Sequence, residues 1–250
     1  MKFHVLCRFE KRSFLDEALP ELLPSFLLSR VSLPLSAPPC LYFISLLFSC
    51  PILQGSSIWL KEAWRVLKSN VSLYVSCTYH NIGEIIFLAK KIGFRLNNII
   101  TWYKTNAMPN ITKRTFTHST EYVCWFVKGN KWKFNYEELK KINPNKRKDG
   151  KPKQMRDFLN FIEMPIVQGK ERIKGENGRA IHPTQKPEKL LEIIIIASSN
   201  EGDIVLDPFF GTGTTGVVAE RLNRKWIGIE INEKFIKVAK NRVYGGIGHA

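Results

Sequence analysis

The residues whose types and spacing most clearly indicate a functional site lie late in the chain, in the stretch DPFFGTGTTG at positions 207–216. This stretch has the spacing Gly211-x-Gly213-x-x-Gly216, which is typical of a strand-to-helix turn where the backbone approaches a nucleotide-like ligand. A tight turn without any ligand could use the same glycines, so the spacing alone is weak evidence. The flanking residues therefore have to identify the ligand.

Two carboxylates flank this glycine loop and argue against a dinucleotide. Asp207 directly precedes the loop, where it would repel a pyrophosphate but can accept hydrogen bonds from an ammonium group. Glu230 ends the next expected strand, where a carboxylate can accept both hydroxyls of a ribose. An ammonium group and a ribose occur together in S-adenosylmethionine, whereas a nicotinamide oxidoreductase would need further strands after Glu230. We therefore expect S-adenosylmethionine at Asp207, Phe209, Gly211, Thr212, Gly213, Thr214, Thr215 and Glu230.

The elements that must position this loop alternate between strand and helix. Residues 71–79 and 120–129 are rich in β-branched and aromatic residues, as buried strands are. Residues 82–93 have apolar side chains at helical spacing and end on a glycine. Such alternation predicts an α/β protein with a mostly parallel, Rossmann-like sheet and helices on both faces. Further strands are expected at 95–104, 203–209 and 225–231, and further helices at 57–70, 186–199, 213–222 and 232–243.

The stretch LDPFFGTGTTGVVAERLNRKWIGIEINEKFIKVAKNRV, residues 206–243, resembles the cofactor-binding half of DNA amino-methyltransferases, which methylate exocyclic amines of adenine or cytosine. HPTQKP at 182–187 resembles the motif that precedes that half and lies beside the methionine end of the cofactor. Residues 97–110 and 114–129 resemble the adenine methyltransferases of restriction–modification systems. The resemblance covers roughly residues 58–242. It adds four residues to the expected cofactor site: His182, Thr184, Gln185 and Lys186.

The order of the motifs is similar to that of a permuted class of this family, in which the catalytic half precedes the cofactor half. The resemblance implies an S-adenosylmethionine-dependent methyltransferase fold and methyl transfer to a flipped base of double-stranded DNA. Adenine N6 is the preferred target and cytosine N4 the alternative. The resemblance also implies a cognate restriction endonuclease as a cellular partner. It leaves the DNA recognition sequence and the oligomeric state open.

The same resemblance implies a tetrapeptide, Asp/Asn/Ser-Pro-Pro-aromatic, whose first side chain accepts the hydrogens of the target amine. The sequence contains no such tetrapeptide. The nearest string is Ala37-Pro38-Pro39-Cys40, which is either a chance pair of prolines or a remnant of the motif. No catalytic residue is therefore assigned, and the alternative to an enzyme is an inactive remnant that still binds S-adenosylmethionine or DNA.

Residues 1–57 differ in composition from the rest of the chain. Between residues 22 and 57, 28 of 36 residues are Phe, Leu, Ser, Pro or Cys, and only Arg30 is charged. These residue types share pyrimidine-rich codons, which suggests off-frame or rearranged coding sequence joined to a normal downstream frame. We therefore divide the chain into an aberrant, poorly ordered N-terminal segment, 1–57, and a methyltransferase domain, 58–250.

The charge of the chain predicts a polyanionic partner. Lys and Arg number 38 against 22 Asp and Glu, a formal net charge of +16. Eleven of the basic residues lie between Lys128 and Arg156, within a region, 128–180, that we expect to be an inserted target-recognition region. Nearby aromatic residues are expected to pack or to touch bases, namely Trp132, Phe134 and Tyr136. The expected phosphate contacts are Lys146, Arg147, Lys148, Lys151 and Lys153.

The remaining polar residues have less specific signals. His118 and Glu121 lie three positions apart and are expected to be structural, because a strand of the parallel sheet follows them. Lys104 and Arg114 are candidates for the DNA or cofactor cleft. The five cysteines form no metal-ligand pattern, and the N-terminus lacks the layout of a signal peptide. We therefore expect a cytoplasmic protein with no metal and no membrane partner.

Overall fold

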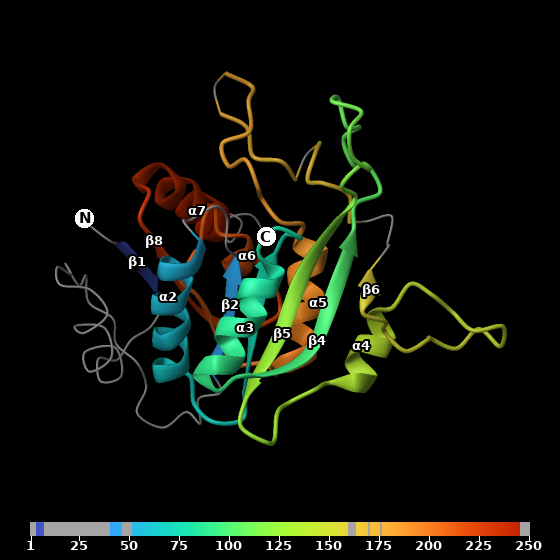
Figure 1. The fold of residues 1–250 in the computed structure, drawn as a ribbon, viewed down its shortest axis with the longest axis vertical. Helices are drawn as coiled ribbons and strands as arrows, with labels where there is room; N and C mark the ends of the chain where they lie inside the picture. Colours follow the sequence, from blue (N-terminus) through green and yellow to red (C-terminus); the bar gives the residue numbers. More distant parts are fainter. Residues whose placement is uncertain are drawn as a thin grey trace.

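A mixed sheet of eight strands with helices on both faces forms the centre of the molecule (Figure 1). The computed structural model describes residues 4–7, 41–46, 52–159, 164–169, 171–175 and 177–245. The strands, in the order in which they lie in the sheet, are β1 (His4–Cys7), β8 (Lys225–Glu230), β7 (Ile204–Asp207), β2 (Leu41–Leu46), β3 (Val71–Cys77), β5 (Thr120–Lys128), β4 (Arg95–Tyr103) and β6 (Phe158–Leu159). The helices are α2 (Ile52–Val66), α3 (Ile82–Ile92), α4 (Tyr136–Ile142), α5 (Glu188–Ser198), α6 (Thr214–Arg221) and α7 (Glu233–Gly245).

The sheet is parallel around β7 and antiparallel around β5. β8, β7, β2 and β3 pair in parallel, whereas β5 is antiparallel to both β3 and β4. The expectation that a parallel strand follows His118 is therefore wrong. The physical reason is the connection: residues 104–119 join β4 to β5 without a crossover helix, so the chain turns back along its neighbour.

Two hydrophobic cores hold the helices against the two faces of the sheet. On one face, α2 and α3 bury Leu60, Ala63 and Ile85 against side chains of β3 and β5. On the other face, α5 packs with α4 and α6, and α6 packs with α7. Leu190 to Ser198 of α5 are all buried except Glu192, because the helix lies between the sheet and other helices. Among the described residues, no helix combines the length and the apolar character needed to span a bilayer.

The boundaries of the elements follow the sequence prediction closely in most places. The strand expected at 71–79 and the helix expected at 82–93 are observed as β3 and α3, and Gly93 ends α3 with φ +124°. Helix α2, however, begins at Ile52, before the expected start at residue 57. Strand β2 also comes from the first 57 residues, and it lies between β7 and β3 in the middle of the sheet. The division of the chain at residue 57 stays a prediction.

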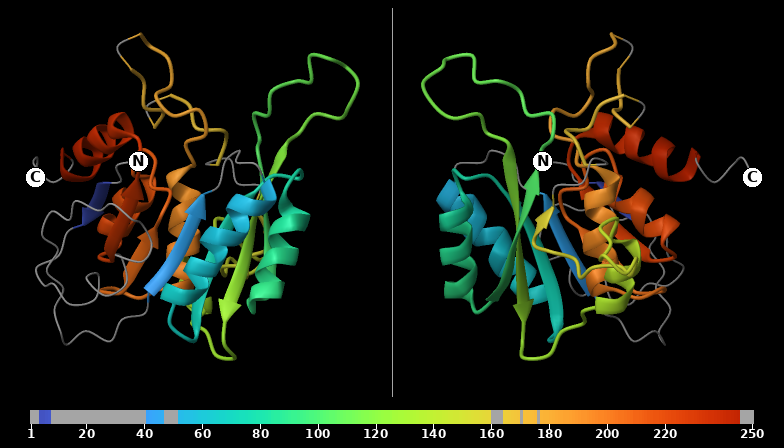
Figure 2. Two further views of the ribbon diagram at one scale, coloured as in Figure 1. Left: turned by 60° about the vertical axis from the view of Figure 1, so that its left-hand side comes forward. Right: turned by 90° about the vertical axis from the view of Figure 1, so that its right-hand side faces the viewer.

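Two long loops extend beyond the edge of the sheet where the parallel strands end. One joins β4 to β5 and comprises residues 104–119, and the other leads from residue 164 into α5. Both rise on the same side of the molecule in all views, in green and in orange (Figures 1 and 2). Open α/β sheets bind their ligands at this carboxyl edge. The glycine loop after β7 lies at the same edge.

Phe210 of the glycine loop packs against Gly216 and Gly228, which have no side chains and so leave room for its ring. The ring stacks on Trp226 at 5.1 Å between centroids. A Cβ atom added at Gly228 would lie 2.5 Å from the Phe210 ring, so Gly228→Ala must displace a buried aromatic side chain. We expect this variant to lower the free energy of unfolding by about 1–3 kcal/mol in urea denaturation.

Gly83 in α3 provides the matched control, because a Cβ added there meets no atom within 4 Å. Gly83→Ala should leave stability unchanged or raise it by up to about 1 kcal/mol, since alanine favours the helix. Equal unfolding midpoints for the two variants would contradict the packing argument.

Candidate functional site

The glycine loop places the beginning of α6 at the carboxyl edge of the sheet. Gly211 and Gly213 have φ angles of +52° and +81°, a backbone conformation that side chains disfavour. A Cβ added at Gly213 would lie 2.9 Å from the Cβ of Ala239, so α7 also excludes a side chain there. The first N–H groups of α6 therefore point towards this edge, where they attract negative or polar ligand atoms.

Asp207 is the buried acidic group of the site. Its side chain is fully buried at the end of β7. One carboxylate oxygen accepts a hydrogen bond from the Phe209 N–H at 3.0 Å, and the other accepts one from the Thr215 hydroxyl at 2.6 Å. Burial raises the pKa of Asp207 to about 7, against the opposing effect of these two hydrogen bonds. The carboxyl group thus joins the end of β7 to the first turn of α6.

Glu230 connects the end of β8 to the glycine loop. One of its oxygens accepts a hydrogen bond from the Gly211 N–H at 2.7 Å. The other accepts hydrogen bonds from the N–H groups of Ile231 at 2.9 Å and Asn232 at 2.8 Å. Asp207 and Glu230 therefore lie on the two sides of one loop, as the sequence predicts.

The residues of the HPTQKP motif separate into two groups. The imidazole of His182 lies over Gly211, since a Cβ added at Gly211 would be 3.3 Å from its Nε2 atom. Burial lowers the pKa of His182, although the nearby Glu230 opposes this shift. Thr184 donates its backbone N–H to His182 Nδ1 at 3.3 Å. Gln185 instead holds the preceding loop together, because its amide bonds to backbone atoms of Glu171 and Ile173.

Lys186 belongs to a buried ionic network rather than to the glycine loop. Its ammonium group lies 2.6 Å from one oxygen of Glu121, and Lys104 lies 3.3 Å from the other. Lys186 is only 3% exposed, and burial lowers its pKa while the contact with Glu121 raises it. Glu121 thus connects the ends of β4 and β5 to the motif before α5. A cavity of about 180 Å³ beside this network is also lined by Trp102, Arg172 and His182.

Two further residues contact the glycine loop although the sequence does not predict it. Arg242 of α7 donates to the Thr214 hydroxyl at 2.9 Å and to the Thr212 carbonyl at 3.2 Å. Trp59 of α2 packs edge-on against Phe209, with ring centroids 5.9 Å apart. Within the described residues, the buried Trp59 Nε1–H has no hydrogen-bond acceptor. The sequence indicates only that Trp59 lies on the apolar face of a helix.

Strand β2 brings its carboxyl end to the same edge. Phe43 pairs with Leu206 of β7, and Leu46 pairs with Ser76 of β3. The residues that follow β2 in the sequence are Leu-Phe-Ser-Cys-Pro, at positions 47–51, and they contain no Pro-Pro pair. The candidate string Ala37–Cys40 lies outside the described residues. It precedes β2, whose first residue pairs with Ile204 at the amino end of β7.

The five basic residues proposed as phosphate contacts lie on one exposed hairpin. The hairpin joins α4 to β6 and is closed by hydrogen bonds from the Arg147 N–H to the Lys151 carbonyl at 2.8 Å and from the Lys153 N–H to the Asn145 carbonyl at 3.0 Å. It projects to the side in Figure 1, whereas the loops at the carboxyl edge rise at the top. The structure therefore brings His182 and Glu230 to the glycine loop that follows Asp207. It places Gln185, Lys186 and the basic hairpin elsewhere. Arg114 lies exposed on loop 104–119.

Comparison with known proteins places this arrangement in a family. The sequence profile of the family described as "DNA methylase" matches residues 52–241. The type II methyltransferase M2.LlaDCHI of Lactococcus lactis subsp. cremoris is 44% identical over 191 residues, which cover 75% of this chain and 65% of that protein. M2.DpnII of Streptococcus pneumoniae is 44% identical over 188 residues, covering 74% and 65%. M.HinfI of Haemophilus influenzae is 42% identical over 188 residues, covering 74% and 50%. The chain thus spans about half to two thirds of the length of these curated relatives.

Solved structures agree with this placement. The complex of M1.HpyAVI with SAM is 30% identical, with a TM-score of 0.62 and coverage of 82% of this chain and 89% of that chain. PvuII DNA methyltransferase, which is cytosine-N4-specific, is 20% identical, with a TM-score of 0.61 and coverage of 83% and 86%. The second similarity concerns the fold alone. The predicted methyltransferase fold is confirmed.

The buried carboxyl group of Asp207 makes the stability of the protein depend on pH. The pKa of this group is about 7 in the folded chain, and its ordinary value is 3.8. Between these two pH values the folded state therefore retains a proton that the unfolded state has lost. The free energy of unfolding should therefore fall as the pH rises from about 4 to about 7. Asp207→Asn removes this ionisation, so its stability relative to the unaltered chain should rise over that window by up to about 4 kcal/mol.

Urea unfolding at pH 4.5, 6 and 7.5 measures this difference. Asp149→Asn, which alters an exposed carboxylate on the basic hairpin, is the matched control and should leave the pH dependence unchanged. A stability difference between Asp207→Asn and the unaltered chain that is constant across pH would contradict the shifted ionisation.

Proposed function

This chain belongs to the DNA methylase family, and we propose that it binds S-adenosylmethionine at the carboxyl edge of its sheet and acts as a DNA methyltransferase on adenine N6. The observation that carries the proposal is the glycine loop, with Asp207 on one side and Glu230 on the other. The relatives at 42–44% identity are type II methyltransferases, which supports the same class of reaction here.

The residues present at the edge fit this cofactor. The N–H groups at the start of α6 suit polar atoms of such a ligand, and the His182 ring lies beside them over Gly211. Asp207 accepts two hydrogen bonds of the about four that a carboxylate can accept. Its side chain is fully buried, so an ammonium group would reach the remaining lone pairs only after the loop shifts. Trp59 offers an indole N–H beside Phe209 that has no acceptor within the described residues. When bound, the cofactor would supply the sulfonium methyl group, while these residues hold and orient it.

DNA would lie across the same edge, between the two long loops. Loop 104–119 exposes Met108, Ile111 and Phe116, with 73%, 88% and 96% of their surfaces accessible. Lys113 and Arg114 are exposed on the same loop. Apolar side chains beside cations are the combination with which proteins enter DNA between base steps and bind the adjoining phosphates. A target base must leave the stack to reach the cofactor, and this loop stands where it could assist that movement.

A second candidate function is cofactor and DNA binding without methyl transfer. The amine nitrogen of adenine is a poor nucleophile, and its alignment with the methyl group is the main contribution of the protein to the rate. The end of β2 lies at the cofactor edge, yet no Asp/Asn/Ser-Pro-Pro-aromatic tetrapeptide follows it in the sequence. This observation favours a remnant that retains the cofactor site.

We also propose that the cellular counterpart is a restriction endonuclease that cleaves the same DNA sequence, and that both act in the cytoplasm. The type II names of the relatives support this pairing. Methylation of the recognition sequence would then protect the DNA from that endonuclease.

Incubation of the chain with S-adenosylmethionine labelled in its methyl group and with mixed-sequence duplex DNA separates the two functions. We expect calorimetric binding of the cofactor, and nucleoside mass spectrometry should detect N6-methyladenine if transfer occurs. Cofactor binding that Asp207→Asn abolishes, without any methylated base, would establish the remnant instead. Absence of cofactor binding would overturn both functions.

The basic hairpin is tested by the salt dependence of DNA binding. Replacing Lys146, Arg147, Lys148, Lys151 and Lys153 by glutamine should weaken binding to all duplex sequences and reduce the slope of log K against log salt by up to about 4. The control set consists of four exposed lysines in or next to α2 and α3, on the other face of the sheet: Lys61, Lys68, Lys90 and Lys91. Their replacement should leave the slope nearly unchanged. An unchanged slope in the hairpin variant would refute the assignment.

A further inference from the structure

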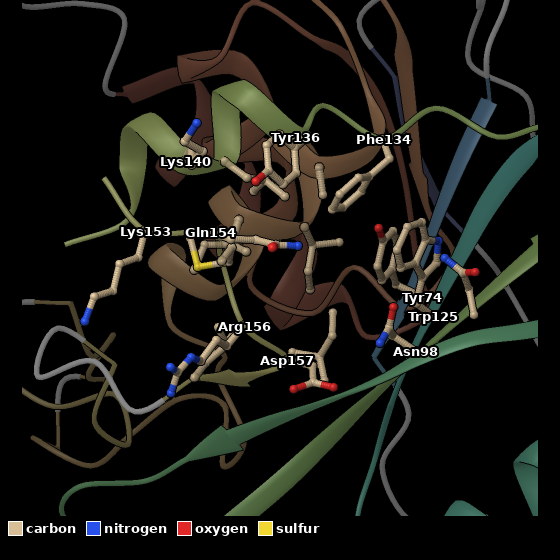
Figure 3. A pocket seen from close by; sticks show the side chains of 18 of the residues that line it. Tyr74, Asn98, Trp125, Phe134, Tyr136, Lys140, Lys153, Gln154, Arg156 and Asp157 are labelled. Atoms are coloured by element: carbon tan, nitrogen blue, oxygen red, sulfur yellow. The ribbon is translucent and has the colours of Figure 1, made fainter. Parts of the chain in front are cut away.

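A large cavity lies on the face of the sheet that carries α4 and α5, apart from the glycine loop. It has a volume of about 850 Å³, is open to solvent, and is lined by strands β3, β4 and β5, by the two helices and by the basic hairpin (Figure 3). Trp125 of β5 faces Tyr74 and Asn98 across the strand ladder, so the cavity lies against the middle of these strands. Ala197, near the end of α5, also lines it, whereas α5 begins beside the cofactor edge. None of the residues expected to hold S-adenosylmethionine lines this cavity.

The floor of the cavity is a stack of aromatic rings. The Trp125 ring is stacked between Tyr74, at 5.7 Å, and Phe134, at 5.4 Å between centroids. Phe134 and Tyr136 are 43% and 40% exposed within this concave surface. Planar heterocycles gain about 1–3 kcal/mol per base when they stack on such side chains. The floor therefore suits a flat aromatic ligand.

The rim of the cavity carries polar side chains that the fold does not use. Asn98, Gln154, Arg156 and Asp157 are exposed, and their labelled side chains surround the cavity in Figure 3. In the part of the chain that the structure describes, none of the four has a side-chain hydrogen bond or ion pair. A cavity with an apolar floor and a few converging polar groups is the usual form of a ligand site.

The positive charge of the rim indicates an anionic ligand. Lys153 and Arg156 line the cavity and, among the described residues, neither is in an ion pair. Arg147 also lines it but is paired with Asp149 at 3.5 Å. Unpaired cations beside an aromatic floor suit an anion with a flat ring. An acidic peptide would leave the stack of rings unused, and a neutral apolar ligand would leave the cations unused.

We propose that this cavity is a second nucleotide site, which takes a nucleoside monophosphate unit. The base stacks on Phe134 and Tyr136, its polar edge meets Asn98, Gln154 and Asp157, and its phosphate is held by Lys153 and Arg156. The unit comes either from a free nucleotide or from an unpaired nucleotide in a DNA strand. This site goes beyond the proposed methyl transfer and does not depend on it.

Tryptophan fluorescence of the full chain reports binding, because Trp125 and Trp132 both line the cavity. The probes are deoxyadenosine monophosphate and a short single-stranded oligonucleotide. We expect both probes to change the emission in a saturable manner. Phe134→Leu should weaken binding about tenfold, and Arg156→Gln should weaken it by a similar factor and reduce its salt dependence. Phe87→Leu, which alters a phenylalanine that is 63% exposed on α3, is the matched control and should have no effect.

Calorimetry with S-adenosylmethionine separates this proposal from the proposed function. Phe134→Leu should retain cofactor binding, while Asp207→Asn should lose cofactor binding and retain binding of the monophosphate. Tighter binding of the oligonucleotide than of the monophosphate would identify the DNA strand as the source, and equal binding would identify the free nucleotide. The proposal is overturned if neither probe binds at millimolar concentration, or if Phe134→Leu and Phe87→Leu bind equally well.

Discussion

The hydrogen bonds of the Asp207 carboxyl group are the interactions on which the glycine loop at the carboxyl edge of the sheet depends. The carboxyl group is fully buried, and it ties the last residue of β7 to the Phe209 N–H and to the Thr215 hydroxyl in the first turn of α6. A buried carboxyl group is costly to ionise, and here burial raises its pKa to about 7. A ligand ammonium group at this position would favour the ionised form. The group that orders the loop is thus also one whose ionisation a cationic ligand would favour.

The order of the strands explains why the site can be formed from distant parts of the chain. Because β8, β7, β2 and β3 are parallel, their carboxyl ends meet at one edge, and residues far apart in sequence become neighbours there. Glu230 reaches Gly211 in this way. Lys186, in the segment before α5, reaches Glu121 at the start of β5. The antiparallel pairing of β5 returns Glu121 to the same edge as the end of β4. A local pattern can mark the glycine loop, but only the topology brings the ionic network beside it.

Features with a local sequence pattern can be predicted from the sequence, whereas contacts that depend on the topology cannot. The loop at Gly211 and the elements around it have local signals, namely glycine spacing, a strand before and a helix after, and they were predicted correctly. The role of Glu121 depends on contacts with Lys104 and Lys186, which lie 17 and 65 positions away. The direction of β5 depends on the absence of a helix between residues 104 and 119, which strand propensity does not report. The contribution of Trp59 likewise depends on how α2 lies beside Phe209.

The direction of β2 determines where a catalytic tetrapeptide would have to lie in the sequence. A tetrapeptide that presents an amine to the methyl group has to leave β2 at its carboxyl end, because the amino end of this strand pairs with the amino end of β7. The two adjacent prolines of the chain precede β2, so the direction of the strand argues that they are a chance pair. The residues proposed to hold the cofactor follow β7 and β8, whereas the missing tetrapeptide would follow β2, so the two sets can be lost separately. A chain with an ordered Asp207 and Glu230 and no tetrapeptide after β2 is the arrangement expected if only the second set has been lost.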